Sequence, residues 1–261
     1  MLDDILTLKA KMLIVFDLTG YFAHFRKHFS TTSSLSYTFP PRTTLCGVVA
    51  SILGYDRNEY YEEFSSENCG IGLQVMKPVR RLLQAVNYIM TDDEAISFFK
   101  RTFRWRGEPA QIRLELITAD GRIPSEVHYR VFFHHQDAQL MKHLEDKMRS
   151  RKSYYPPYLG TANNLTTLRY IGSMEAEFFQ PGGDIYVSTV IPVSRIKSME
   201  PEKGLRIYRE ELVPADFFKD RTLKRMESYI YEEAGKPIKV KIDGVAFKCK
   251  VNGEEVIGTF L

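Results

Sequence analysis

The fold of this chain is built around one apolar stretch, Lys11-Met12-Leu13-Ile14-Val15-Phe16-Asp17-Leu18. Its length and its β-branched and aromatic residues are typical of a buried strand. A second apolar stretch over residues 45–53 predicts a helix, whose start Thr43 or Thr44 could cap. Small residues within that stretch would let the helix lie close against a sheet.

The pattern that follows alternates strands and helices. Residues 71–90, 112–117 and 128–133 read as strands, and residues 137–148 place their apolar side chains on one helical face. After a turn-rich loop over 154–165, the further predicted strands are 176–179, 185–193, 205–213, 238–242 and 245–251. The order β-α-β-β-α-β is that of the ferredoxin-like fold, which also underlies the RRM. We predict an α+β protein with this domain over residues 1–190 and a smaller C-terminal β-rich region over residues 191–261.

Composition limits the class of protein. The 261 residues carry a net charge of +3, which permits a nucleic-acid partner without requiring one. The three cysteines show no CxxC spacing, so neither a zinc knuckle nor a disulfide framework is indicated, and a reduced, cytoplasmic compartment fits. We expect no metal and no cofactor. No apolar run approaches the ~20 residues of a membrane span, so we expect no membrane partner.

A local charge asymmetry gives the first functional signal. Residues 18–55 contain no Asp or Glu, while cations, hydroxyls and aromatic rings are interleaved there. Phosphates are bound by the first two groups, and unstacked bases by the third. The alternative is a solvated loop whose Phe residues anchor it to the core. The RNA-binding candidates are Arg26, Lys27, His28, Ser33, Ser34, Tyr37, Arg42, Thr43 and Thr44.

Two further segments combine suitable residue types. Residues 98–106 hold four aromatics and four cations without an acid, and they predict an arm from the sheet that stacks on bases. The alternative there is a strand with one buried face and Trp105 in the core. The loop over 158–164 offers a Gly for close backbone approach and Asn side chains that can read base edges, although turns use the same residues. The candidates are Lys100, Arg101, Arg104, Trp105, Arg106, Tyr158, Gly160, Thr161, Asn163 and Asn164.

Histidines supply the only catalytic alternative. His134-His135 and Lys142-His143 could assist metal-independent RNA cleavage through the 2′-hydroxyl. Their predicted places, a strand–helix junction and an amphipathic helix, favour a structural role instead. The acidic pairs of the chain have no His or Cys at metal-ligand spacing, which argues against two-metal nuclease chemistry. We therefore expect no catalytic residues.

These segments together resemble a known family. The run Phe16-Asp17-Leu18-Thr19-Gly20-Tyr21-Phe22-Ala23-His24-Phe25-Arg26-Lys27, continued through residues 31–37 to Phe39-Pro40-Pro41-Arg42-Thr43, is similar to the N-terminal signature of the CRISPR-associated Cas-five family, in the RAMP superfamily. Pro156-Pro157-Tyr158-Leu159-Gly160 resembles a second family block. The Thr-Thr-Ser-Ser run over 31–34 is most similar to the type I-B branch.

The resemblance implies a function. It implies a protruding β-hairpin thumb near residues 86–110, carrying residues 98–106. It also implies a non-catalytic subunit of a type I interference complex (Cascade), acting in antiviral defence. The subunit would cap the 5′ handle of the crRNA and touch a Cas-seven-type backbone subunit and a large Cas-eight-type subunit, meeting target DNA only through the assembled complex.

Two rival functions stay open. In type I-C systems one family branch cuts precursor RNA with a Tyr and an adjacent Lys-His pair. Here Tyr37 could supply the Tyr, but Lys142-His143 and Lys27-His28 both lie at other places than in that branch. The first rival is therefore a metal-independent endoribonuclease that processes precursor crRNA, and the second is a scaffold that binds proteins without touching RNA.

Overall fold

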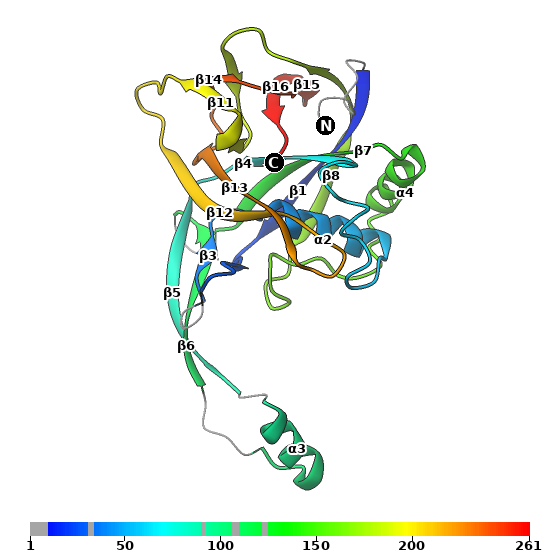
Figure 1. The fold of residues 1–261 in the computed structure, drawn as a ribbon, viewed down its shortest axis with the longest axis vertical. Coiled ribbons are helices and arrows are strands. Elements are labelled where there is room, and N and C mark those ends of the chain that lie inside the picture. The colour runs from blue at the N-terminus through cyan, green and yellow to red at the C-terminus, as the bar shows by residue number, and fades with distance from the viewer. Residues whose placement is uncertain (1–9, 31–33, 90–91, 106–109, 122–124) are drawn as a thin grey trace.

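The computed structural model describes residues 10–30, 34–89, 92–105, 110–121 and 125–261 (Figure 1). The α+β class predicted from the sequence is confirmed. The elements are β1 (Ala10–Gly20), β2 (Phe25–Arg26), β3 (Ser36–Tyr37), α2 (Arg42–Leu53), β4 (Cys69–Val75), β5 (Val79–Tyr88), α3 (Asp93–Thr102), β6 (Ala110–Ala119), β7 (Val127–His135), α4 (Ala138–Arg149), β8 (Thr167–Phe179), β9 (Ile185–Val187), β10 (Ile191–Pro192), η1 (Val193–Arg195), β11 (Ile196–Met199), β12 (Ile207–Phe217), β13 (Leu223–Glu232), β14 (Ile238–Ile242), β15 (Ala246–Val251) and β16 (Glu254–Thr259).

A six-stranded antiparallel sheet with the order β16-β15-β8-β1-β7-β4 forms the centre of the molecule. The apolar stretch at residues 11–18 lies in its interior strand β1, between β7 and β8. Alternate residues of β1 face opposite sides of the sheet. Ile14, Phe16 and Leu18 share one core cluster with α2 and α4, whereas Leu13 and Val15 belong to a second cluster with β15. A strand buried on both faces explains why this stretch is apolar throughout.

The two packed helices cover one face of this sheet. In chain order the elements β1, α2, β4, β7, α4 and β8 give strand, helix, strand, strand, helix and strand. Buried side chains of α2, such as Val49, and of α4, such as Leu144, join the same cluster as the apolar residues of β4 and β7. Both helices therefore pack on the same side of the sheet.

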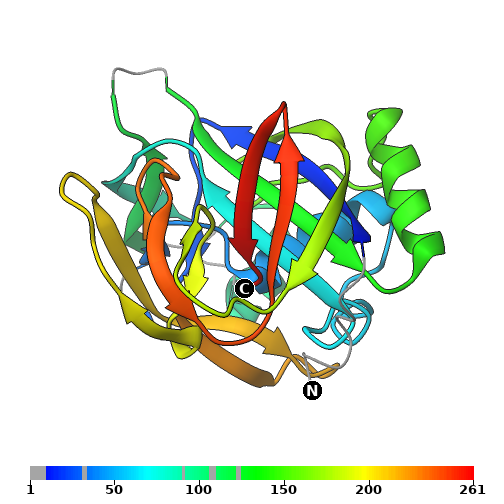
Figure 2. The same ribbon diagram turned by 90° about the horizontal axis from the view of Figure 1, so that it is seen from above.

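The opposite face is covered because the sheet curls. Figure 2 shows β15 and β16, in red tones, crossing in front of the central strands. The Phe247 ring lies 5.1 Å from that of Phe132, and the Leu261 N–H donates to the Ile71 carbonyl of β4 at 2.9 Å. Strands from the predicted C-terminal region thus belong to the same sheet as β1, so the sheet crosses the predicted boundary at residues 190 and 191.

Two three-stranded sheets, the short β2–β3 pair and the β5–β6 hairpin make up the other sheets of the described residues. The three-stranded sheets have the orders β10-β13-β12 and β11-β14-β9. The hairpin of β5 and β6 projects from the body and carries α3 at its far end (Figure 1). The alternative of a strand over residues 98–106 is wrong for residues 98–102, which belong to α3. Asp92 caps this helix by accepting from the Ala95 N–H at 2.7 Å, and acids in its first turn and cations in its last turn suit the helix dipole.

Candidate nucleic-acid interface

A hollow of about 1000 Å³ lies beside α2, where three loops meet the helix. Tyrosines dominate its walls, and we refer to it as the tyrosine groove. Two of the predicted RNA-binding segments contribute to it, the start of α2 and the loop that begins at Tyr158. Its lining includes Thr43, Thr44, Gly47, Ser51, Tyr55, Asp56, Arg57, Tyr60, Tyr61, Tyr155, Pro156, Tyr158, Gly160, Leu165, Phe217 and Arg221.

The tyrosine rings in the groove are suited to stacking. Tyr155 and Tyr158 are 41% and 44% exposed, so much of each side chain is open to solvent. The rings of Tyr60 and Tyr61 lie 4.6 Å apart, and Tyr61 meets the edge of Phe217 at 5.8 Å. Burial raises the pKa of Tyr60, so its hydroxyl stays protonated at neutral pH. Aromatic rings bind unstacked bases of any sequence, which matches a single-stranded nucleic acid.

The start of α2 gives the groove its positive end. Pro41 occupies the N-cap position without a side-chain cap, and the first turn holds no acid. An uncapped helix N-terminus presents N–H groups and partial positive charge, which attract phosphate. Arg57 and Arg221 add cations to the lining, while Asp56 is engaged by the Tyr155 hydroxyl at 2.9 Å.

The predicted loop over 158–164 is held against the strand segment near His24. Gly160 has φ of +89°, and a Cβ added there would lie 2.0 Å from the His24 carbonyl oxygen, so only Gly fits. The Leu159 carbonyl accepts from the His24 N–H at 3.0 Å, and the N–H of Leu159 donates to the Asn164 carbonyl at 2.7 Å. Thr161 lies within the same turn, where its hydroxyl accepts from the Asn164 amide at 3.0 Å.

The loop separates the tyrosine groove from a second hollow of about 370 Å³. Asn163 and Asn164 line this hollow together with Thr118 at the base of β6. Leu165 lines both hollows, so they adjoin at this residue, and we refer to the two hollows together, from the start of α2 to the base of the β5–β6 hairpin, as the track.

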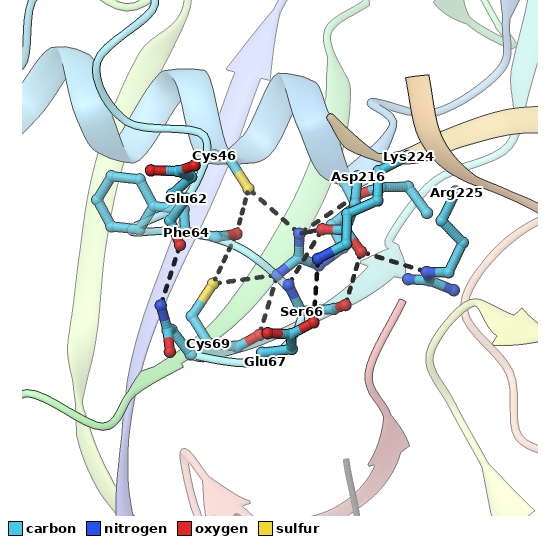
Figure 3. A network of polar contacts seen from close by, with 12 residues as sticks. Cys46, Glu62, Phe64, Ser66, Glu67, Cys69, Asp216, Lys224 and Arg225 are labelled. Carbon is cyan, nitrogen blue, oxygen red and sulfur yellow. Dashed lines mark hydrogen bonds and ion pairs between the residues drawn. The ribbon is translucent and has the colours of Figure 1, made fainter. Parts of the chain in front are cut away.

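Arg42 does not belong to this surface. Its side chain is 1% exposed, and its guanidinium donates to Asp216 at 2.7 Å and to the Cys69 carbonyl at 3.0 Å. Figure 3 shows Asp216 also meeting Ser66 and Arg225, beside Cys46 and Cys69. The expected phosphate contact by Arg42 is wrong, because this cation ties α2 to β4 and β12 inside the protein.

The β2–β3 segment forms a separate cluster. Tyr37 is buried, and its hydroxyl donates to the Leu212 carbonyl, so its ring is no stacking platform. Lys27 pairs with Glu210 at 2.9 Å, and the His28 Nδ1 lies 3.4 Å from the Tyr37 hydroxyl. Arg26 is exposed, with one hydrogen bond to the Ser30 carbonyl.

The remaining predicted residues lie in two places. Ser34 contacts His24 through Oγ and Nε2 at 2.9 Å, and Ser33 lies outside the described residues. Lys100, Arg101 and Arg104 are exposed at the hairpin tip, far from the tyrosine groove (Figure 1). Trp105 is 39% exposed and its ring lies 5.6 Å from that of Phe99, so the alternative of a core Trp is wrong. Arg106 lies outside the described residues.

The histidines considered for catalysis are in contrasting places. His134 is buried and its pKa is lowered to about 4, chiefly by desolvation. His135 is buried as well, with Nε2 near the Glu63 carbonyl. His143 is exposed in a hollow that it shares with Asp56, Glu59 and Asp137, and these acids repel phosphate.

Sequence reasoning missed most of the groove's tyrosines. Tyr60 and Tyr61 are flanked by Glu residues in the sequence, and an acidic segment does not indicate RNA binding. Phe217 and Arg221 belong to the C-terminal β region, and only the fold brings them to α2. The signals that pointed to this surface were the hydroxyls of Thr43 and Thr44 and the loop over residues 158–164. Among the described residues no group of three or more His, Cys, Asp or Glu is placed to hold a metal ion, and none of the described helices is long and apolar enough to cross a membrane.

Comparison with known proteins identifies the family. Residues 13–185 match the profile described as "CRISPR-associated protein (Cas_Cas5)". The chain belongs to this family. The match covers β1 to the start of β9, including the two loops and the helix start that form the tyrosine groove, except for Phe217 and Arg221. A search of curated proteins found no match.

Solved structures are similar to the chain at low sequence identity. A crystal structure of a CRISPR protein from Archaeoglobus fulgidus is 13% identical, with a TM-score of 0.51 over 95% of this chain and 99% of that chain. A chain of a CRISPR RNA-guided surveillance complex is 12% identical, with a TM-score of 0.46 over 87% of this chain and 90% of that chain. At 13% identity the first similarity supports a shared fold alone.

Proposed function

We propose that this Cas-five protein is a non-catalytic subunit of a type I CRISPR interference complex, and that it binds the single-stranded 5′ handle of crRNA in the tyrosine groove. The observation that carries the proposal is the groove itself, an open hollow of about 1000 Å³ with several tyrosines and an uncapped helix start. Stacking rings beside phosphate-binding N–H groups suit an unpaired nucleic acid. Because the chain belongs to a CRISPR-associated family, we infer that the bound nucleic acid is RNA.

The sheet order supports the ferredoxin-like fold that this proposal includes. We infer that β1, α2, β4, β7, α4 and β8 form a ferredoxin-like unit, because these elements give the sheet order β8-β1-β7-β4. We further infer that the β5–β6 hairpin is the family's thumb and that the system is of type I-B. In the assembled complex the protein then lies between a backbone subunit of the Cas-seven type and a large subunit of the Cas-eight type, and meets target DNA through the complex.

The track explains how one RNA segment is held. Phosphates lie toward Thr43 and Thr44 at the start of α2, and bases stack on Tyr155 and Tyr158. The strand then passes Leu165 into the second hollow, where Asn163 and Asn164 offer donors and acceptors. The handle thereby ends at the base of the β5–β6 hairpin, beside Thr118.

The test is RNA binding by groove variants. Tyr158→Ala with Tyr155→Ala removes two exposed rings, and at about 1–3 kcal/mol per stacked base we expect an affinity loss of at least tenfold for labelled repeat RNA. Tyr186→Ala is the matched control, because Tyr186 is 49% exposed and lies on β9, outside the groove. Equal binding by all variants, with complex assembly unaffected by RNase, favours the scaffold function instead.

One observation supports the endoribonuclease alternative. The fold brings together Tyr37, Lys27 and His28, a Tyr with an adjacent Lys-His pair, and the Lys27 Nζ lies 5.0 Å from the centre of the Tyr37 ring. Both Lys27 and the Tyr37 hydroxyl are already engaged, by Glu210 and the Leu212 carbonyl, which supports the non-catalytic assignment. Incubation of the chain with repeat RNA in EDTA decides between them. A discrete cut that His28→Ala or His143→Ala abolishes makes the protein a processing nuclease.

A further inference from the structure

One stretch of the β5–β6 hairpin is apolar and exposed. Residues 82–89 of the chain, called the hairpin shaft here, contain no Asp, Glu, Lys, Arg or His. Leu83 is 61% exposed, Tyr88 is 43% exposed and Ile89 is 63% exposed. On β5 itself the nearest cations are Arg80 and Arg81 at one end of the shaft, and those of α3 lie beyond the other end, while the exposed Arg113 of the neighbouring strand β6 pairs with Ala85. The shaft therefore differs from the tyrosine groove, in which rings are mixed with charges.

The backbone edge of β5 is open, whereas that of β6 is partly occupied. Within the described residues, β5 pairs along its length with β6 and with no other strand. The other edge of β6 is covered near its base, where Ile117 exchanges hydrogen bonds of 2.8 Å with Ala23 and Ser34 bonds to Arg113 and Glu115. In an antiparallel pair, alternate residues of an edge strand point their N–H and C=O groups outward. The shaft thus presents a ladder of backbone groups beside apolar side chains.

Such an edge is unusual in a protein that works alone. A two-stranded hairpin in water is marginally stable, and exposed edges are usually protected by Lys, Pro or a bulge. The shaft has none of these protections, and β5 and β6 pair in an unbroken register from Val79 to Tyr88. Packing against another chain would both cover the apolar side chains and complete the ladder.

We propose that the open edge of β5 receives an extended, uncharged segment of another protein subunit, which adds to the hairpin as a third strand. The inference rests on the proposed function for the existence of an assembled complex. Strand addition joins chains through backbone hydrogen bonds and matches side chains at alternate positions. RNA is the poorer occupant, because a phosphate backbone is held by cations and the shaft has none.

Hydrogen–deuterium exchange tests the ladder. The probe is the complex purified from cells that co-express the neighbouring subunits and the crRNA, compared with the chain alone. We expect the outward-pointing backbone amides within residues 80–88, which do not bond to β6, to exchange at least tenfold more slowly in the complex, and to keep this protection after RNase treatment. Protection that disappears with RNase assigns the shaft to RNA and overturns the proposal.

Leu83→Lys separates the two occupants by charge. The added cation blocks an apolar strand but attracts RNA, so we expect at least tenfold weaker retention in the complex with undiminished affinity of the isolated chain for RNA. Gln111→Lys, which adds the same charge to the exposed face of β6, is the matched control and should assemble normally. Unchanged or stronger retention of Leu83→Lys refutes strand addition. A wild-type chain that joins no complex refutes the proposed function as well, whereas a chain that assembles with freely exchanging β5 amides refutes only this inference.

Discussion

The buried side chain of Arg42 stabilises the fold through Asp216, and a substitution at this position tests that role. The change Arg42→Met keeps the apolar stem and removes the guanidinium. Asp216 would then be left 4% exposed without its closest cation, which lies 2.7 Å away. Removing one partner of a buried ion pair costs about 3–5 kcal/mol, because the remaining charge is uncompensated. Asp216 keeps Ser66 and Arg225, so we expect the lower end, about 3 kcal/mol.

The assay is thermal unfolding of the purified chain, followed by circular dichroism, because the single Trp105 lies at the hairpin tip and does not report on the core. For a chain of this size, about 3 kcal/mol corresponds to a fall in Tm of roughly 6–12 °C. Arg225→Met is the matched control, since Arg225 contacts the same carboxylate but is 34% exposed. An exposed pair of this kind is worth about 1 kcal/mol or less. A variant Arg42→Met with wild-type stability and a salt-sensitive loss of RNA would refute this reasoning and restore Arg42 to the interface.

Three further predictions concern other positions. Gly160→Ala should lower the free energy of unfolding in urea by at least about 2 kcal/mol, because φ at Gly160 is +89° and the new Cβ would clash with the His24 carbonyl oxygen. Gly182→Ala is its control, since Gly182 has no positive φ and no neighbour within 4 Å of an added Cβ. Glu210→Gln should cost about 2 kcal/mol and speed amide exchange at the base of β5, because its buried carboxylate bonds Lys27 and Arg81, whereas the exposed Glu211→Gln should change neither. Burial raises the pKa of Asp216, but Arg42, Ser66 and Arg225 outweigh it and lower the pKa below its usual value. Its contribution is therefore fully present above about pH 4 and is lost as the pH falls further, so Asp216→Asn should lose more stability at pH 7 than at pH 3.

The central sheet could be predicted because its signals are local. The stretch at residues 11–18 is apolar on both faces of a strand, and it became β1 between two partners. The apolar helix at residues 45–53 is likewise set by its own sequence, and α2 starts at Arg42 just after Pro41. For residues 98–102 the alternation of aromatics and cations predicts an arm from the sheet, whereas Asp92 at the N-cap and the order of acids and cations along the segment favour the helix α3. Helix capping by Asp92 therefore predicts the structure of this segment better than its aromatic content does.

Site residues were harder to predict because burial depends on distant partners. Arg42 and Tyr37 lie in the acid-free segment that indicates RNA binding, yet each has a partner in β12. Arg42 bonds to Asp216 and Tyr37 to the Leu212 carbonyl, more than 170 residues later in the chain. A charge pattern reveals which residue types are present, and the counter-charge that draws them inside comes from elsewhere. Thr43 and Thr44 at the helix start line the tyrosine groove instead, and we propose them for the RNA-facing role.

The same reasoning explains why the groove and the shaft differ as surfaces. The tyrosine groove is assembled from α2, two loops and the end of β12, so no single stretch of sequence carries its character. The shaft is one continuous strand, and its lack of charge is visible in the sequence from Leu82 to Ile89. What the sequence could not reveal is which edge of the hairpin is open: residues near Ala23 and Ser34 bond to β6, whereas within the described residues no strand besides β6 pairs with β5. A covered edge on one side and an open edge on the other direct any added strand to β5, away from the track that ends beside Thr118 on β6.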